Sequence, residues 1–244
     1  MRSALVVGGA NGIGLAIATL LAQNDSFEQV HIVDRQAVDA QYQHPKFCVT
    51  TFDLRSDDYS IFDKYGDVDT LIITAGFGRL AHFADVDEQH IVDSFAVNST
   101  AVIRIIRHFY DRIRGNEEFY CAVMGSIAGF ISSPLFAVYG ATKAALKVFI
   151  ESVNVELEMT GAANRILNIS PGSIKGTAFY NGANDLAVTR QLAEDILSHL
   201  WAKDDLFIPQ YDEIFKNVLE RYHQDFRAEG RHSYEYKMQS GRVK

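Results

Sequence analysis

The sequence predicts an α/β fold built on one doubly wound parallel sheet with helices on both faces. Short apolar runs rich in valine and isoleucine alternate with longer segments of helical pattern. Nearly continuous apolar character is typical of strands buried on both faces, and alternation with helices favours a parallel sheet. A glycine-rich turn follows the first run. The 244 residues, 48% of them hydrophobic, suffice for one domain over residues 1–244 and are few for two.

The expected elements follow one another without an internal repeat or a low-complexity tract. Strands are predicted over residues 4–7, 30–33, 47–52, 69–74, 119–124, 165–169 and 206–208. Helices are predicted from the glycine turn to residue 23, after residue 56, up to residue 115, and over 139–159, 186–201 and 211–226. Residues 229–244 are polar and contain glycine and serine, which indicates a mobile tail or one that packs on a partner subunit.

The charge and the apolar pattern exclude several classes of protein. The formal net charge of −8 argues against binding to nucleic acid or to an anionic membrane surface. No apolar run approaches the ~18–20 residues of a membrane span, and the first glycine comes too early for a signal peptide. Cys48 and Cys121 each lie in a strand-like run, where two separate buried thiols indicate a reducing compartment. We therefore expect a cytoplasmic protein.

The turn after the first strand has the spacing G-x-x-x-G-x-G. It contains Gly8, Asn11, Gly12, Ile13 and Gly14. Glycines let the backbone approach a pyrophosphate closely, and the positive end of the following helix favours the negative charge. A flexible strand–helix junction is the alternative explanation, since a glycine motif alone is weak. Its position after the first strand favours a Rossmann-type dinucleotide site.

The end of the second strand indicates which dinucleotide is bound. Asp34 follows Gly14 by twenty residues, about the separation at which a carboxylate binds the adenosine ribose hydroxyls. The same carboxylate would repel a 2′-phosphate, so Asp34 favours NAD(H) over NADP(H). Asn11 brings no positive charge to the turn, while Arg35 softens the preference. The alternative for Asp34 is an ordinary residue of a strand-end turn.

Two further strand ends point to the same edge of the sheet. Asp53 and Leu54 follow the third strand, and Ala75 and Gly76 follow the fourth. Because parallel strands carry their carboxyl ends to one edge, these residues can line the adenosine pocket. For either pair alone, a plain strand-end turn explains the residues as well.

Tyr139 and Lys143 lie four residues apart at the start of a predicted helix. This spacing places them on one helix face, where the ammonium is expected to lower the pKa of the phenol and prepare it for proton exchange. Ser126 follows the fifth strand and could hold a substrate oxygen beside the phenol. Asn98, in the helix after the fourth strand, could bind a water that links Lys143 to solvent. Singly, these residues could also be surface contacts, a cap or exposed helix positions.

Together these motifs resemble the short-chain dehydrogenase/reductase family. The matching segments, in family order, are Gly8-x-x-x-Gly12-Ile13-Gly14, Ala75-Gly76, Asn98, Ser126, Tyr139-Gly140-Ala141-Thr142-Lys143 and Pro171-Gly172. The resemblance implies catalytic roles for Asn98, Ser126, Tyr139 and Lys143, with Tyr139 as the acid/base. It also implies cofactor contacts from Tyr139, Lys143, Pro171, Gly172 and Ile174, hydride transfer to or from a small carbonyl or alcohol substrate, no metal, and a homodimer or homotetramer.

The sequence departs from the family pattern in three places. Val7 stands where the family usually has threonine, and Thr74 where it has asparagine. Both departures are expected to remove local hydrogen bonds near the turn and the adenosine pocket. Thr177 falls one place later than the usual threonine, which puts the expected contact with the nicotinamide amide in question.

The substrate side is predicted from composition alone. Residues 174–189 are rich in glycine and asparagine, which suits either a lid over the substrate or a plain surface loop. Aromatic and apolar residues nearby could line a partly apolar pocket or belong to the core or to a subunit contact: Phe130, Pro134, Leu135, Phe136, Phe179 and Tyr180. The competing functions are a non-catalytic dinucleotide sensor on the same fold and, with a poorer match of glycine spacing, a nucleotide-sugar epimerase.

Overall fold

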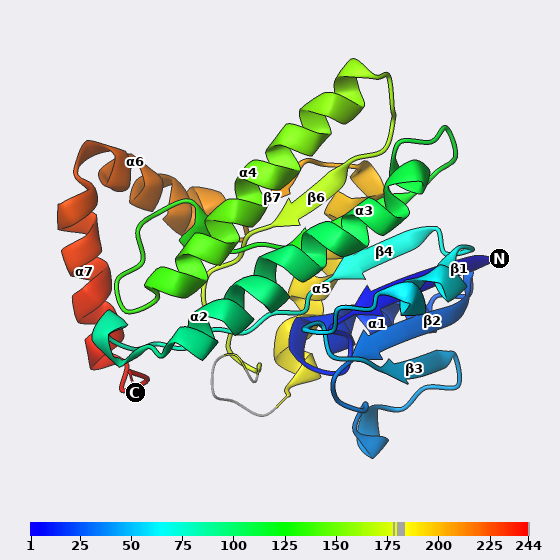
Figure 1. Ribbon diagram of the computed structural model, residues 1–244, viewed down its shortest axis with the longest axis horizontal. Coiled ribbons are helices and arrows are strands. Elements are labelled where there is room, and N and C mark those ends of the chain that lie inside the picture. Colours follow the sequence, from blue (N-terminus) through cyan, green and yellow to red (C-terminus); the bar gives the residue numbers. More distant parts are fainter. Residues whose placement is uncertain (178, 180–183, 244) are drawn as a thin grey trace.

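The computed structural model describes residues 1–177, 179 and 184–243. Within them the chain forms a seven-stranded sheet in the order β3-β2-β1-β4-β5-β6-β7, and every strand pair is parallel. The strands are β1 (Arg2–Val7), β2 (Phe27–Asp34), β3 (Phe47–Thr51), β4 (Thr70–Ile73), β5 (Tyr120–Met124), β6 (Ile166–Ile169) and β7 (Leu206–Phe207). The predicted fold class is confirmed (Figure 1).

Helices cover both faces of the sheet. On one face α1 (Gly12–Gln23) packs beside α5 (Leu186–Ala202), and on the other lie α3 (Ala101–Ile113) and α4 (Ala137–Met159) (Figure 1). Alternate residues of a strand point to opposite faces. Leu5 therefore packs in the core under α3 and α4, while Val6 packs in the core under α1. Burial on both sides explains why the strands read as continuous apolar runs.

The strand order places a crevice at the carboxyl ends of β1 and β4. From β1 the chain proceeds outward to β2 and β3, then returns to pair β4 on the other side of β1. The segments that follow β1 and β4 therefore diverge, and ligands of such sheets bind at this switch point. The glycine turn and Gly76 follow these two strands.

The long helix predicted up to residue 115 is interrupted. Asp87 begins α2 (Glu88–Phe95) by accepting a hydrogen bond from His90 N at 2.7 Å. A π-helical turn, Ala96–Thr100, then joins α2 to α3 and contains Asn98. Single π turns inside helices are frequent at functional sites, so this irregularity draws attention to Asn98.

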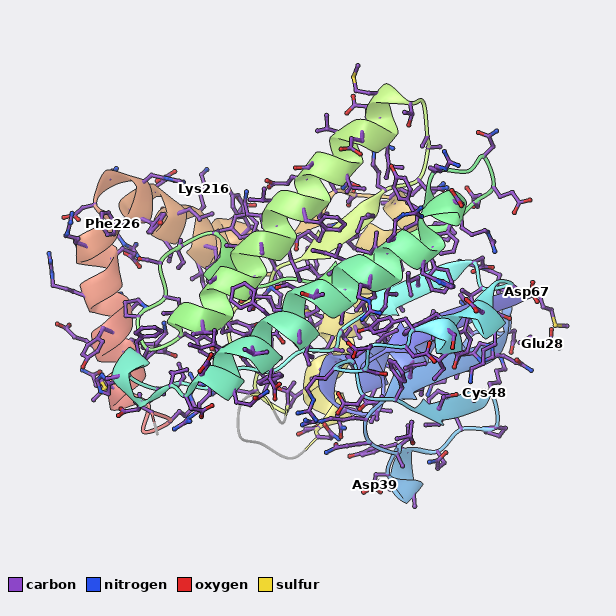
Figure 2. All side chains as sticks on the ribbon, in the orientation of Figure 1. Glu28, Asp39, Cys48, Asp67, Lys216 and Phe226 are labelled. Atoms are coloured by element: carbon purple, nitrogen blue, oxygen red, sulfur yellow. The ribbon has the colours of Figure 1, made fainter. Side chains whose placement is uncertain are left out.

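Two expectations about the edge of the sheet are wrong. The segment after residue 56 forms only a 3₁₀ helix, Ser60–Tyr65, because the short link to β4 folds inward to bury Phe62 and Tyr65. Cys121 is buried as expected, but Cys48 is exposed. Cys48 lies in β3, the edge strand, whose faces are less covered than those of the central strands (Figure 2).

The C-terminal residues form a helical hairpin. A π-helical turn (Tyr211–Phe215) leads into α6 (Lys216–Gln224), and α7 (Phe226–Gln239) follows. The helix predicted over 211–226 stops early because Asp225 is extended and accepts hydrogen bonds from Arg227 N and Ala228 N. Most of the predicted tail, residues 229–244, is thus helical. The hairpin lies at the opposite end of the molecule from β1–β3 (Figure 1), and Lys216 and Phe226 mark the starts of its helices in Figure 2. None of the described helices has the length and apolar character needed to cross a bilayer.

Candidate active site

A cavity of about 880 Å³ opens at the carboxyl ends of the strands. Segments that follow each of the strands β1 to β6 line it, together with residues of α6 and α7. The lining includes nearly all the predicted cofactor residues: Gly8, Asn11, Gly12, Ile13, Gly14, Asp34, Arg35, Leu54, Ala75, Gly76, Tyr139, Lys143, Pro171, Gly172 and Ile174. It also includes the catalytic candidate Ser126, but not Asp53 or Asn98.

The glycine turn is packed so tightly that side chains do not fit. Gly8 has φ +87°, and a Cβ there would lie 2.4 Å from the backbone N of Ala75. A Cβ on Gly14 would lie 2.3 Å from the carbonyl oxygen of Gly8. The turn therefore brings the ends of β1 and β4 and the start of α1 together, and leaves backbone at the cavity wall. Such a cradle is the shape that a pyrophosphate requires.

Thr74 makes a hydrogen bond at the position where replacing the family's usual asparagine was expected to remove one. Its hydroxyl donates to Gly8 O at 3.0 Å, so the expected loss of local hydrogen bonding at this position is wrong. Threonine can make this bond because β1 and β4 are neighbours and both end here. Thr177 donates to Ile174 O at 2.9 Å and packs its methyl group over Gly12.

Asp34 links β2 to the glycine turn. Its Oδ2 accepts a hydrogen bond from Ala10 N at 3.0 Å, and its Oδ1 accepts one from Gln36 N at 3.1 Å. The carboxylate is thereby fixed at the cavity wall with Arg35 next to it. Each carboxylate oxygen can accept further bonds, so these contacts do not prevent it from binding ribose hydroxyls.

Asp53 points to an arginine instead of the cavity. Its carboxylate pairs with Arg55 at 2.6 Å, and Arg55 also pairs with Asp93 at 3.0 Å. The hydrogen bonds from Arg55 lower the pKa of Asp53 to about 2. The neighbouring Leu54 and Arg55 take the place at the cavity wall that the sequence suggested for Asp53.

Asn184 is a polar contact that the sequence did not reveal. Its Oδ1 accepts a hydrogen bond from Gly12 N at 2.8 Å, and its Nδ2 donates to Asn11 Oδ1 at 2.8 Å. Tyr42 holds the segment in place by donating to Asn184 O at 3.1 Å. The amide oxygen of Asn184 thus occupies a donor at the N-terminus of α1, where an anion would bind.

Tyr139 lies in the cavity wall in an aromatic cluster. Its ring stacks on Phe136 with centroids 4.3 Å apart, and Phe179 lies 5.3 Å away. Burial raises the pKa of Tyr139 to about 12, while a hydrogen bond with the Ser126 side chain acts to lower it. Ser126 and Tyr139 are therefore brought together, and the phenol is protonated at neutral pH.

Lys143 and Asn98 both approach Gly76. Lys143 Nζ donates to Met124 O, at the end of β5, at 2.7 Å. A Cβ on residue 76 would lie 3.3 Å from Asn98 Oδ1 and 3.4 Å from Lys143 Nζ. Asn98 is fully buried and donates to Phe77 O and Thr142 Oγ1, so it positions the segment after β4 beside the ammonium.

The expected lowering of the Tyr139 pKa by Lys143 is not what the structure shows. Lys143 Nζ lies 5.6 Å from the Tyr139 ring centroid and donates its hydrogen bond to Met124 O instead. Both groups are buried, and burial disfavours both charged forms. It therefore raises the pKa of Tyr139 and lowers that of Lys143 to about 8. Spacing on a helix predicted the pair, but it could not predict how deeply the pair is buried.

One wall of the cavity comes from α7. Its lining residues recur at helical spacing and are all polar: Glu229, His232, Ser233, Tyr236 and Lys237. Glu229, which is almost fully buried, accepts hydrogen bonds from Arg221 of α6 at 2.7 and 3.2 Å. Lys237 ties the helix to the segment before α4 by donating to Ser133 Oγ and Pro134 O. The predicted tail is therefore a wall of the candidate site, and its contact with a partner subunit stays a prediction.

The predicted substrate residues divide into two groups. Phe136 and Phe179 line the cavity, whereas Phe130, Pro134 and Leu135 do not. Tyr180 lies outside the described residues, as do residues 178 and 181–183 of the predicted lid. Residues 186–189 at the end of that segment form the first turn of α5. The lid itself stays a prediction.

A parallel sheet with a glycine cradle at its switch point and a Ser–Tyr–Lys cluster beside it defines a dinucleotide-binding oxidoreductase fold. A model of the family described as short chain dehydrogenase matches residues 2–186, well over half of the chain. The chain therefore belongs to the short-chain dehydrogenase/reductase family. An uncharacterized short-chain type dehydrogenase/reductase of Sinorhizobium fredii is 28% identical over 195 residues, which are 79% of this chain and 77% of that protein.

Solved structures show the same fold. A short-chain dehydrogenase from Streptomyces avermitilis superposes with a TM-score of 0.76 at 20% identity, covering 98% of this chain and 100% of that one. A short-chain dehydrogenase from Burkholderia cenocepacia, in complex with NADP, superposes with a TM-score of 0.73 at 19% identity, covering 91% and 98%. The family establishes a hydride-transferring oxidoreductase and does not favour the alternative of a non-catalytic sensor.

Proposed function

We propose that the protein interconverts a carbonyl compound and an alcohol with NAD(H), and that Tyr139 is the general acid/base. The observation that carries this proposal is the joint placement of Tyr139, Ser126 and Lys143 in the wall of one cavity whose other end is the glycine cradle. In the reductive direction the carbonyl carbon gains a hydride, and the oxygen gains the Tyr139 proton. A phenol whose pKa is raised to about 12 by burial is protonated at neutral pH and suits this donor role.

The neighbours of Tyr139 have separate roles in the proposal. The Ser126 hydroxyl, which lines the same cavity and acts to lower the pKa of Tyr139, holds the substrate oxygen beside the phenol. Lys143 carries positive charge below its lowered pKa of about 8, and this charge stabilises a phenolate formed during turnover. Asn98 acts as a positioning residue, because it holds the segment after β4 against Lys143.

The cavity fits a nicotinamide dinucleotide. The glycine turn leaves room for the pyrophosphate, and Asp34 is placed at the end of β2 for the adenosine ribose. When bound, the nicotinamide ring supplies or accepts the hydride. We propose NAD(H) over NADP(H) because the Asp34 carboxylate would repel a 2′-phosphate. Arg35 opposes this preference, and the Burkholderia cenocepacia relative was solved with NADP.

We also propose that the protein is a homodimer or homotetramer of the cytoplasm. Two apolar side chains of α4, Val148 and Val155, are 60% and 58% exposed and lie seven residues apart on one helix face. A second copy could cover this face. The free and exposed thiol of Cys48 suits a reducing compartment.

The test combines cofactor titration with one substitution. We expect the wild-type protein to bind NADH more tightly than NADPH in thermal-shift and fluorescence titrations. Tyr139→Phe should leave the Kd for NADH within about twofold and lower kcat for a carbonyl panel by ~10²–10⁴-fold, the usual contribution of general acid–base catalysis. Tyr120→Phe is the matched control, since it removes a phenol hydroxyl that bonds to Glu118 outside the cavity. Full activity in Tyr139→Phe would refute the assignment of the acid/base.

A further inference from the structure

One cation at the substrate end of the cavity has only neutral hydrogen-bond partners within the part of the chain that the structure describes. Lys237 Nζ donates to Ser133 Oγ at 2.6 Å and to Pro134 O at 2.9 Å. Among the described residues, no carboxylate lies within 4.0 Å of this ammonium. An ammonium has three N–H donors, and these two acceptors use two of them.

The acidic residue on the same helix face, Glu229, is already hydrogen-bonded to Arg221. Glu229 stands two turns before Lys237 on α7 and also lines the cavity. Both of its carboxylate oxygens accept hydrogen bonds from Arg221, which holds the carboxylate toward α6. Arg221 therefore neutralises the charge of Glu229, and the charge of Lys237 is not balanced by this carboxylate.

More positive charge gathers beside Lys237. A smaller cavity of about 130 Å³ shares Phe136, Phe179 and Lys237 with the main one, and its lining adds Arg79 and Arg242. No acidic residue is among the described residues that line it. Burial, and then the charge of Arg242, lower the pKa of Lys237 to about 8, so the ammonium is still charged at neutral pH. Like charges held in a partly buried site favour the binding of an anion.

The cationic site and the acid/base share an aromatic neighbour. Lys237 Nζ lies 6.0 Å from the ring centroid of Phe136, and that ring stacks on Tyr139 at 4.3 Å. Phe179 lies against both rings. A substrate whose carbonyl reaches Tyr139 would thus extend along an apolar surface before it meets the ammonium.

We propose that Lys237, with Arg79 and Arg242 beside it, is a subsite for a carboxylate on the substrate. The inference rests on the proposed function and names its substrate class: keto acids or aldehyde acids in which a short apolar segment separates the carbonyl from the carboxylate. The ammonium donates a charge-assisted hydrogen bond to the carboxylate, while Phe136 and Phe179 contact the segment between. In the simpler alternative, Lys237 only ties α7 to Ser133 and Pro134.

The first experiment compares acids with their methyl esters in the wild-type protein. The pairs are para-carboxybenzaldehyde with methyl para-formylbenzoate, and levulinate with methyl levulinate. We expect at least one acid to exceed its ester in kcat/KM by about tenfold or more, mostly through a lower KM, as for a hydrogen bond to a charged group. Equal kcat/KM within every pair would overturn the subsite. If neither acids nor esters are reduced, the proposed function fails, which is a different result.

The second experiment separates charge from tethering. Lys237→Gln keeps N–H donors for Ser133 and Pro134 without the charge, and Lys237→Met removes both. We expect Lys237→Gln to lose the preference for acids while its kcat/KM for esters stays within about twofold, and Lys237→Arg to keep most of the preference. Lys237→Met should lose the preference as well, and any further loss that it shows for esters measures the tether. Arg231→Met is the control, because Arg231 is an exposed cation of the same helix outside both cavities. An equal loss for acids and esters in Lys237→Met and Lys237→Gln would show that Lys237 is only a tether.

Discussion

The two ends of the cavity are built in different ways. The cofactor end consists mainly of backbone and side chains at the ends of β1, β2, β3 and β4, within the first 76 residues. The far end combines the aromatic rings of Phe136 and Phe179 with polar side chains of α7, and α7 lies beyond the residues matched by the family model. The first end is fixed by sterics of the turn, whereas the second is fixed by ion pairs and hydrogen bonds between helices.

This difference matches the two tasks of the cavity, which are to bind the cofactor at one end and the substrate at the other. A cofactor common to many relatives needs an unchanging cradle, and tight glycine packing leaves little room for variation. A substrate wall can vary in charge while the sheet stays intact, because α7 contacts the rest of the cavity mainly through side chains such as Lys237 and Glu229. Disturbing one end should therefore leave the binding function of the other measurable.

The largest effect is expected at Gly8. In Gly8→Ala, the new Cβ would lie 2.4 Å from a backbone atom at a residue with φ +87°. Strain and overpacking together should lower the free energy of unfolding by more than about 3 kcal/mol and abolish NADH binding. Urea denaturation and NADH titration measure the two effects.

Gly161 offers a matched control for this substitution. Its φ is +78°, but a Cβ there would meet nothing within 4 Å. Gly161→Ala should cost only the backbone strain, about 1–2 kcal/mol, and should leave NADH affinity unchanged. Similar losses in both alanine variants would show that the turn relaxes and that close packing does not define the cofactor end.

A smaller and more local effect is expected at the ion pair between α6 and α7. Arg221→Ala leaves the buried Glu229 carboxylate without its donor, which should lower stability by about 1–2 kcal/mol, since Arg221 itself is half exposed. The KM for carbonyl substrates should rise, and hydrogen exchange should quicken in α7, while the Kd for NADH stays within about twofold. Arg190→Ala breaks an exposed pair with Glu194 and should cost at most about 0.5 kcal/mol. An equal weakening of NADH binding in Arg221→Ala would mean that the two ends are coupled.

The cofactor end could be predicted from the sequence because its geometry is local. Glycine spacing, strand ends and a helix repeat of four residues placed Gly8, Asp34, Tyr139 and Lys143 at one edge of the sheet, and the cavity includes them all. The spacing of residues does not indicate how deeply their side chains are buried. The raised pKa of Tyr139, which burial causes, was therefore not predicted. The same limit explains Asp53, whose partner Arg55 competes with the cavity for its carboxylate.

The substrate end depends on contacts between distant residues. The sequence showed residues 229–244 only as a polar tail, and nothing local indicates that they form a helix with one face on a cavity. Its position depends on Lys237 meeting Ser133, 104 residues away. The π turn around Asn98 is also a tertiary effect, because the amide is held by Phe77 and by Thr142 of another helix.

The smallest expected effect concerns Asn184, where the chain after β6 reaches back to the first turn. Its side chain occupies Gly12 N, a donor that the pyrophosphate of a bound dinucleotide would use. Asn184→Ala should therefore tighten NADH binding by about 2- to 10-fold, the worth of one net hydrogen bond. Asn24→Ala removes an amide at the opposite end of α1 and should leave the Kd unchanged. If Asn184→Ala weakens NADH binding instead, the Asn184 amide contacts the bound dinucleotide. The cofactor site would then include a residue that is far along the sequence from Gly8.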